Sequence, residues 1–343
     1  MACQCSIIPT DVLKRLSRDK SLSAARRKAF ADTVELETHW RKLRSLQTKT
    51  TAVALRSLSV GATLAVAPAV TVYDCAMGTA LPGSPLDNPG SSTDLTAKRA
   101  FVETTAVAEF YQKVFGRNSV DNLGMTLQSS IHFGVQYNNA FWNGVQMTYG
   151  DGDGNIFVDF TRGNDVIGHE LTHGVTQHSA QLVYTSEAGG LNESISDVFG
   201  SMFRQWRAGQ TVAKADWLIG HDIMGPGAMA KGFTCLRDLA RPAARHCLAA
   251  QPKHYSQIKP GMDPHYSSGI PNLAFYKAAK AIGGKSWETA GQIWYRALTG
   301  YKPSPNMKMK TFANRTRKLA QRMYPGNAAV YAAVNKAWVA VGL

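Results

Sequence analysis

Two histidines and a glutamate stand together in the segment HELTH, which covers residues 169–173. His169 and His173 are four residues apart, so on a helix both imidazoles leave the same face. Two imidazole nitrogens on one face are suitable zinc ligands, and Glu170 beside them provides a carboxylate that can act as a general base. The spacing therefore predicts a helix that carries a catalytic metal.

A second segment, LNESISD at residues 191–197, adds two carboxylates. Glu193 and Asp197 are also four residues apart, and the predicted helix that carries them is otherwise mostly apolar. Carboxylates are rarely buried without a partner, and a metal ion or a metal-bound histidine is a suitable one. Glu193 therefore offers a third ligand, and Asp197 offers a carboxylate behind the ligands.

Both helices have the apolar spacing of buried elements. The residues around HELTH that share this spacing are Val166, Ile167, Leu171 and Val175. We expect the pair Gly189-Gly190 to break the chain between the two helices. Asn192, Ser194 or a neighbour would then cap the second helix.

The stretch HELTHGVTQHSAQLVYTSEAGGLNESISDVFG closely resembles the thermolysin-like zinc metallopeptidases, whose motif is HExxH followed by a glutamate ligand within NExxSD. Four other segments resemble the same family: YNNAFWNG at 137–144, YGDGDG at 149–154, CLRDLARP at 235–242 and DPHYSSGIPNLAFY at 263–276. The resemblance runs from about residue 70 to the C-terminus. It is nearest to the protealysin-like branch, which has a short N-terminal propeptide.

The resemblance implies one catalytic zinc ion held by His169, His173 and Glu193, with a fourth position left open for water or substrate. Zinc lowers the pKa of a water and polarises the scissile carbonyl. Glu170 would take the proton of that water and pass it to the leaving amine. Asp197 would accept a hydrogen bond from the other ring nitrogen of His169.

The family also supplies a tyrosine and a distant histidine as donors to the oxyanion. The matching positions are Tyr184 and His265, which without the resemblance would be an ordinary core tyrosine and a loop histidine. Asp263, two residues before His265, would orient its ring. The family often has a longer loop here than the DPH of this chain.

The resemblance also implies how a peptide would bind. Asn139 and Ala140 match the edge that holds a peptide backbone by strand addition, and Arg237 matches the arginine that holds a backbone carbonyl. An apolar specificity pocket predicts cleavage on the amino side of hydrophobic residues. Its lining residues would be Phe157, Phe160, Val166 and Leu236.

Calcium binding is doubtful in this chain. Many relatives hold calcium beside the zinc site, and Asp165 and Asp216 keep two of the carboxylates involved. Arg204 stands where a glutamate ligand would lie, and Leu218 and His221 occupy two further ligand positions. Calcium takes six to eight oxygen ligands, so a cation in this place argues against a double calcium site.

We expect an α+β fold of the two-lobed thermolysin-like type, with the zinc site in the cleft between a β-rich lobe and an α-helical lobe. The expected divisions are a propeptide at 1–50, a β-rich lobe including the HELTH helix at 51–177, and a helical lobe at 178–343. Alternating runs from Met125 to Phe160 suggest an antiparallel sheet. Helices are expected at about 93–115, 191–207, 271–282, 286–299, 307–323 and 327–340.

The first fifty residues read as a separate unit. IIPTDVL resembles the apolar-proline segment of protealysin-like propeptides, and a charged helix follows at 21–43; an interaction tail is the alternative. The apolar run 51–70 would contain the maturation junction and the first strand, and it is too short and interrupted to span a membrane. Cys3 and Cys5 form a CxC, from which a thiolate could cap the zinc and keep the precursor silent.

The charge and cysteine content of the chain exclude few classes of function. The formal net charge is +14, and residues 301–343 carry many cations and no Asp or Glu, but no nucleic-acid-binding signature accompanies them. A solvated basic face is the simpler interpretation, so we expect no nucleic-acid partner. Five cysteines disfavour a disulfide framework, although Cys235 and Cys247 could pair.

The leading hypothesis is a zinc endopeptidase that acts on proteins or peptides, is made as an autoprocessed zymogen and is inhibited by its own propeptide. A zinc oligopeptidase, a weakly catalytic binding protein that keeps the metal site, and a nucleic-acid-associated protein are the alternatives. Without a conventional secretory signal, the protein would stay inside the cell or leave by an unconventional route.

Overall fold

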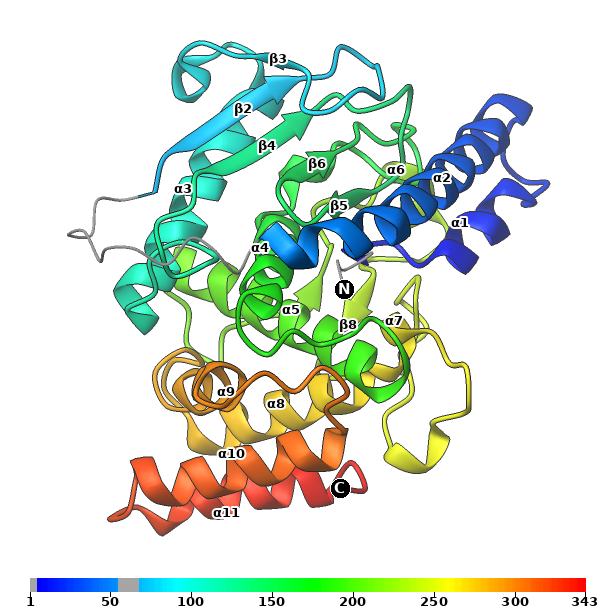
Figure 1. Cartoon of the computed structure of the whole chain (residues 1–343). Coiled ribbons are helices and arrows are strands. Elements are labelled where there is room, and N and C mark those ends of the chain that lie inside the picture. Colours follow the sequence, from blue (N-terminus) through cyan, green and yellow to red (C-terminus); the bar gives the residue numbers. More distant parts are fainter. Residues whose placement is uncertain (1–4, 55–67) are drawn as a thin grey trace.

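The computed structural model describes residues 5–54 and 68–343. A sheet-containing N-terminal lobe lies on one side of two central helices, and a helical lobe lies on the other (Figure 1). This arrangement confirms the predicted α+β class with a β-rich first lobe and a helical second lobe. The boundaries drawn at residues 50 and 177 stay predictions.

A mixed sheet of six strands forms the core of the first lobe, in the order β1-β5-β6-β4-β2-β3. The strands are β1 (Cys5–Ser6), β2 (Val70–Asp74), β3 (Ser84–Pro85), β4 (Leu127–Ile131), β5 (Ala140–Trp142) and β6 (Met147–Tyr149). The prediction of an antiparallel sheet is wrong for β4, which runs parallel to both β2 and β6. The long helix α3 (Leu95–Phe115) lies between β2 and β4 in the chain, and such a crossover returns the chain in the parallel direction.

The N-terminal segment belongs to this lobe in space. Strand β1 adds to the edge of β5, with Cys5 opposite Trp142 and Ser6 opposite Phe141. Helices α1 (Thr10–Ser17) and α2 (Ala24–Ala54) follow and pack against each other. Helix α2 continues past the predicted end at residue 43. The expected junction in 51–70 lies largely in residues 55–67, outside the described residues.

The two central helices are α4 (Asn164–Gln177) and α5 (Ser186–Arg207). They pack closely at Gly200, where a Cβ atom would lie only 2.5 Å from the backbone oxygen of Asp165. This close approach turns the HELTH face of α4 toward the acidic face of α5.

The prediction that Gly189-Gly190 breaks the chain is wrong, since both glycines lie within the first turns of α5. They are needed for packing: a Cβ at Gly189 would lie 2.7 Å from Pro264, and one at Gly190 would lie 2.3 Å from the Ser267 hydroxyl. The expected cap is also wrong, because α5 starts after Thr185, upstream of Asn192. Short contact with the segment 264–267 thus outweighs the low helix propensity of glycine.

The second lobe consists mainly of helices stacked beneath α5 (Figure 1). Its core includes the stacked rings of Trp294 and Trp338, whose centroids are 5.9 Å apart. Its main helices are α8 (Gly269–Ile282), α9 (Ala290–Thr299), α10 (Met309–Met323) and α11 (Ala328–Val339), close to the predicted ranges. The shorter strands and helices after α5 are β7 (Leu218–Ile219), α6 (Pro226–Ala230), β8 (Arg237–Asp238), the 3-10 helix η3 (Tyr255–Gln257) and α7 (Pro264–Ser267). Among the described residues, none of the helices has the length and apolar character needed to cross a membrane.

Candidate active site

The three predicted ligands meet between α4 and α5. The Nε2 atoms of His169 and His173 are 3.1 Å apart, and the Glu193 carboxylate lies 3.5 Å from the first and 3.4 Å from the second. All three side chains are fully buried. A tetrahedral zinc ion with bonds of about 2.0–2.1 Å needs donors about 3.3 Å apart. The side chains therefore fit a zinc ion.

Two further observations agree with this fit. Oε2 of Glu193 is buried and has no hydrogen-bond partner among the described residues, which suits an oxygen reserved for a cation. Burial also lowers the pKa of His173 to about 3, so its ring is neutral at pH 7. Burial opposes ionisation of Glu193, but the charge of His265 contributes most to outweighing it, and the pKa of the carboxyl is lowered. Neutral imidazole and ionised carboxylate are the forms that bind zinc.

Each ligand histidine is oriented through its second ring nitrogen. Nδ1 of His169 lies 2.9 Å from Oδ1 of Asp197, as the sequence predicts. Nδ1 of His173 lies 2.9 Å from Oδ1 of Asn192 and 3.1 Å from the Ser196 hydroxyl, which the sequence analysis missed. The spacing contains a signal for this pair: Asn192 and Ser196 are also four residues apart on α5, on a mostly apolar helix.

Asp197 connects the metal site to the second lobe. Its carboxylate accepts hydrogen bonds from Nε of Arg237 at 2.8 Å, from Nη2 of Arg237 at 2.7 Å and from the amide of Asn272 at 2.8 Å. Burial opposes ionisation, but Arg237 and His169 outweigh it and hold the pKa of Asp197 well below its usual range. Asp197 therefore fixes a ligand histidine and a predicted substrate-binding arginine at once.

Glu170 faces the edge of the sheet. Its Oε2 accepts a hydrogen bond of 3.0 Å from the backbone N–H of Trp142 on β5, and the side chain is fully buried. The carboxylate is thereby held on the helix of the two ligand histidines, against the strand to which a peptide would add. This is the place that a general base needs.

The predicted oxyanion donors also meet. The hydroxyl of Tyr184 lies 3.1 Å from Nε2 of His265 and donates a hydrogen bond to Glu193. Asp263 accepts hydrogen bonds from Nδ1 of His265 at 2.7 Å and from its backbone N–H at 2.9 Å, so the shortened loop keeps an orienting carboxylate. Burial disfavours the charged ring, but Glu193 and Asp263 outweigh it and raise the pKa of His265 to about 9.

The chain's own N-terminal strand lies on these groups. Nε2 of His265 is 2.6 Å from the carbonyl oxygen of Ser6, and Nη1 of Arg237 donates a 2.9 Å hydrogen bond to the carbonyl of Ile7. The N–H of Ile7 donates to the carbonyl of Ala140 at 3.1 Å. One carbonyl at the predicted oxyanion donor and the next one at Arg237 form the arrangement predicted for a bound peptide.

Asn139 completes this pairing. Its side-chain oxygen accepts a 2.9 Å hydrogen bond from the N–H of Ile8, and its amide donates to the carbonyl of Ile8 at 3.2 Å. The same amide donates to the buried carboxylate of Glu37 on α2. Asn139 is therefore held in place by the N-terminal segment on two sides.

The four residues expected to line the specificity pocket, Phe157, Phe160, Val166 and Leu236, are all fully buried and belong to the same apolar cluster as Ile7 and Ile8. The ring of Phe157 packs edge-on against Phe30 of α2, with centroids 6.2 Å apart, and against Phe160 at 5.6 Å. The propeptide helix thus covers part of this apolar region.

Cys5 stands at the metal site. Its sulfur and one donor atom each of His173 and Glu193 all lie within 4.8 Å of one another. Cys5 is disulfide-bonded in this structure, so a zinc-capping thiolate first requires reduction. Cys3, the other cysteine of that hypothesis, lies outside the described residues.

Arg204 lies among the carboxylates that could otherwise hold calcium. Its guanidinium is 2.7 Å from Asp222, 3.5 Å from Asp216 and 3.7 Å from Asp165. Asp165 is fully buried and also accepts a 2.6 Å hydrogen bond from the N–H of Gly220. The guanidinium of Arg204, which stays charged at all ordinary pH values, thus forms ion pairs with three acidic residues.

Comparisons with known proteins agree with the geometry. The chain matches the family model of the thermolysin metallopeptidase catalytic domain over residues 70–177 and that of the thermolysin metallopeptidase alpha-helical domain over residues 180–343. An extracellular metalloprotease of Pectobacterium carotovorum subsp. carotovorum is 40% identical over 284 residues, which are 80% of each chain. Protease PrtS of a Photorhabdus strain is 36% identical, over 80% of this chain and 76% of that protein.

Among solved structures, the precursor of protealysin, a metalloproteinase from Serratia proteamaculans, is similar over the whole chain. The TM-score is 0.83 at 36% sequence identity, and the match covers 98% of this chain and 99% of the precursor. The match therefore includes most of the N-terminal segment that precedes the catalytic domain. The chain belongs to the thermolysin metallopeptidase family and is a zinc metallopeptidase.

Proposed function

We propose that the protein is a neutral endopeptidase that cleaves on the amino side of hydrophobic residues and is made as a zymogen inhibited by its own N-terminal segment. The supporting observation is the docking of Ser6, Ile7 and Ile8. The Ser6 carbonyl oxygen lies 2.6 Å from Nε2 of His265, and the next residue, Ile7, is fully buried in an apolar cluster. In a substrate bound the same way, the residue after the reacting carbonyl is hydrophobic.

The residues of the chain divide the reaction between them. When bound by His169, His173 and Glu193, zinc supplies a water of lowered pKa and polarises the carbonyl. Glu170 takes a proton from the attacking water and delivers it to the leaving amine. Tyr184 and His265 donate hydrogen bonds to the oxygen that becomes negative as the carbonyl is attacked, which stabilises the transition state.

The substrate's backbone is held separately from its reacting carbonyl. Ala140 accepts a hydrogen bond from the N–H that follows the reacting carbonyl, and Arg237 donates to the next carbonyl. Asn139 holds both groups of the residue after that. These contacts fix the register of an extended peptide along β5 and so determine which bond lies at the metal.

Inhibition by the N-terminal segment rests on contacts that reach beyond β1. Asp19 forms a 2.6 Å ion pair with Lys231, and Asp11 accepts a hydrogen bond from the Tyr266 hydroxyl. Trp40 of α2 packs on Phe141 of β5, with ring centroids 6.3 Å apart. A short peptide substrate cannot make these additional contacts, so the N-terminal segment should bind the site more tightly than a substrate does.

The test uses the matured enzyme, a quenched peptide and casein. Activity of the parent should be lost with a zinc chelator. Glu170→Ala, matured by an added protease, should be about 10²–10⁴-fold less active than the parent while zinc stays bound. The same variant should remain full length during expression if removal of the N-terminal segment is autocatalytic. Equal activity of the variant and the parent would contradict the mechanism. A peptide library in which charged residues are preferred after the cleaved bond would contradict the specificity.

A further inference from the structure

We propose that Cys235, His246 and Cys247 form a second metal site that takes a zinc ion and is built from other residues than the catalytic site. One sulfur from each cysteine and one ring nitrogen of the histidine all lie within 4.8 Å of one another. Both cysteines are buried free thiols, and neither takes part in the reaction described above.

The separation of the two sulfurs fits a shared cation. They are 3.8 Å apart. A tetrahedral zinc ion with two Zn–S bonds of about 2.3 Å places its sulfurs about 3.8 Å from each other. A disulfide would require about 2.05 Å.

The backbone holds the two cysteine segments in this position. The N–H of Leu248 donates to the carbonyl of Cys235 at 2.9 Å, and the N–H of Thr234 donates to the carbonyl of His246 at 3.0 Å. A third bond of 3.0 Å joins the N–H of Ala249 to the carbonyl of Leu236. The donors are therefore brought together before any metal binds, which lowers the entropic cost of binding it.

His246 has the companion that metal-binding histidines usually have. Its Nε2 lies 3.1 Å from Oδ2 of Asp238, which is almost fully buried and accepts backbone hydrogen bonds from Ala240 and Arg241 through its other oxygen. A carboxylate behind a histidine fixes the ring and raises its affinity for a metal. The His246 side chain is 24% exposed, so an ion can enter from solvent.

Two thiolates and an imidazole favour zinc over magnesium or calcium, which prefer oxygen donors. Three protein donors leave a fourth position for water. The site would tie the segment that carries Leu236 and Arg237 to the segment that carries Leu248. The metal would thus restrict the movement of Arg237, the residue that we propose binds a substrate carbonyl.

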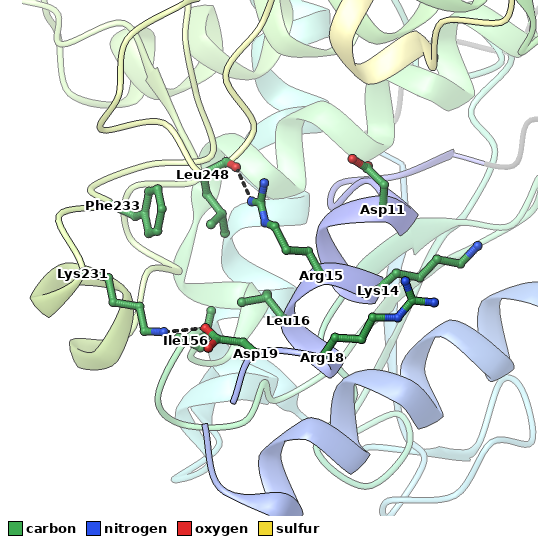
Figure 2. Close-up of a pocket in the computed structure, with 10 residues that line it drawn as sticks. All are labelled: Asp11, Lys14, Arg15, Leu16, Arg18, Asp19, Ile156, Lys231, Phe233 and Leu248. Carbon is green, nitrogen blue, oxygen red and sulfur yellow. Dashed lines mark hydrogen bonds and ion pairs between the residues drawn. The ribbon is translucent and has the colours of Figure 1, made fainter. Parts of the chain in front are cut away.

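The proposed metal site also lies close to the propeptide. Nη2 of Arg15 donates a 2.9 Å hydrogen bond to the carbonyl of Leu248, the residue after Cys247. Figure 2 shows Arg15 reaching from α1 to Leu248, with Phe233 beside Leu248. All three residues line a pocket of about 760 Å³. A metal on Cys247 would therefore fix the surface to which α1 docks.

The test measures metal in the full-length chain carrying Glu170→Ala, purified with a reductant and loaded with zinc. The combined substitution Cys235→Ser and Cys247→Ser should roughly halve the zinc bound per chain, because only the catalytic site remains. Cys75→Ser removes another buried cysteine and should leave the zinc content unchanged. His246→Ala changes a partly exposed position and should weaken binding of the second zinc ion. This variant replaces the double variant in the test if the double variant does not fold.

Cobalt provides an independent readout. A cobalt-loaded chain should show a near-ultraviolet thiolate-to-metal absorption band that is lost in the Cys235→Ser and Cys247→Ser variant. Because Cys5 lies near the catalytic ligands, the band must also persist in Cys5→Ser. Equal zinc content in the double variant and its parent would overturn the proposal, as would a Cys235–Cys247 disulfide found by mass spectrometry in the reduced, zinc-loaded protein.

Discussion

The carbonyl oxygen of Ser6 lies 2.6 Å from Nε2 of His265, although 259 positions separate the two residues in the chain. The precursor thus satisfies the donor that we assign to the substrate's reacting carbonyl with a carbonyl of its own. Because the contact depends on the register of β1 on β5, any change that displaces this strand should uncover the site.

Ile7→Asp should make the uncut precursor active. Ile7 is fully buried, and an unpaired carboxylate in an apolar cluster costs several kcal/mol, so β1 should leave its place. The measurement is hydrolysis of a quenched peptide by precursor that electrophoresis shows to be intact. Lys20→Asp, at an exposed position of the same segment, is the matched control and should stay inactive. Continued latency of the Ile7 variant would argue against inhibition by β1.

Removing calcium should leave the stability of the protein unchanged, because Arg204 already joins Asp165, Asp216 and Asp222. A calcium-selective chelator, with zinc kept in the buffer, should not shift the melting temperature. Arg204→Glu should lower the free energy of unfolding by about 3–5 kcal/mol, and millimolar calcium should restore part of the loss. Arg207→Glu, on the same helix but more exposed, is the control. A large drop on chelation in the parent would show that calcium binds after all.

His132 should make stability depend on pH. Its ring nitrogens lie 2.9 Å from Asp151 and 2.9 Å from Asp94, and these carboxylates raise its pKa to about 9, with burial opposing them. Since the folded pKa is above the unfolded value of 6.5, the contribution is complete below about pH 6.5 and is lost as the pH rises through about 9.

The variant His132→Asn tests this and suits the positive φ of 51° at the position. It should cost about 1–2 kcal/mol at pH 6, after allowance for solvent screening, and almost nothing at pH 10. The readout is denaturant unfolding at the two pH values. His39→Asn, at an exposed position, should give the same small difference at both. A His132 variant that behaves likewise would contradict the assignment.

Replacing Cys3 and Cys5 by serine should partly activate the reduced precursor if a thiolate of this pair caps the zinc. The sulfur of Cys5 lies in the ring of donors formed with His173 and Glu193, and because Cys5 is disulfide-bonded in this structure, the comparison must be made in a reductant. Peptide hydrolysis by intact precursor is the measurement, with Cys75→Ser as control. Unchanged latency of the double variant would leave inhibition to the strand contacts alone.

The sequence predicts the metal site better than the elements around it. The four-residue spacing of His169 and His173, and of Glu193 and Asp197, fixes one face of each helix, so the ligands could be found without knowing the fold. Tyr184 and His265 are 81 positions apart and have no local pattern. Only the family resemblance pointed to them, because nothing in their neighbourhood predicts that the chain returns to the same place.

The errors arose where tertiary contacts decide local structure. Gly189 and Gly190 have the propensity of a helix break, but their packing against Pro264 and Ser267 keeps them helical. Alternation around β4 predicts a strand and says nothing of its direction, which the α3 crossover sets. The sequence suggests a helix cap at Asn192, because its contact with His173 depends on how α4 and α5 pack.

Strand β1, which we propose to be inhibitory, and the expected maturation cut lie at opposite ends of the propeptide. β1 occupies residues 5–6, whereas the cut is expected between residues 51 and 70, after the whole of α1 and most of α2. Cutting there breaks none of the bonds that hold β1 in the site. It converts a tethered ligand with a high effective concentration into a separate molecule whose occupancy depends on dilution. Onset of activity should therefore be governed by dissociation and destruction of the released fragment, and concentrated enzyme should remain silent for longer after cleavage than dilute enzyme.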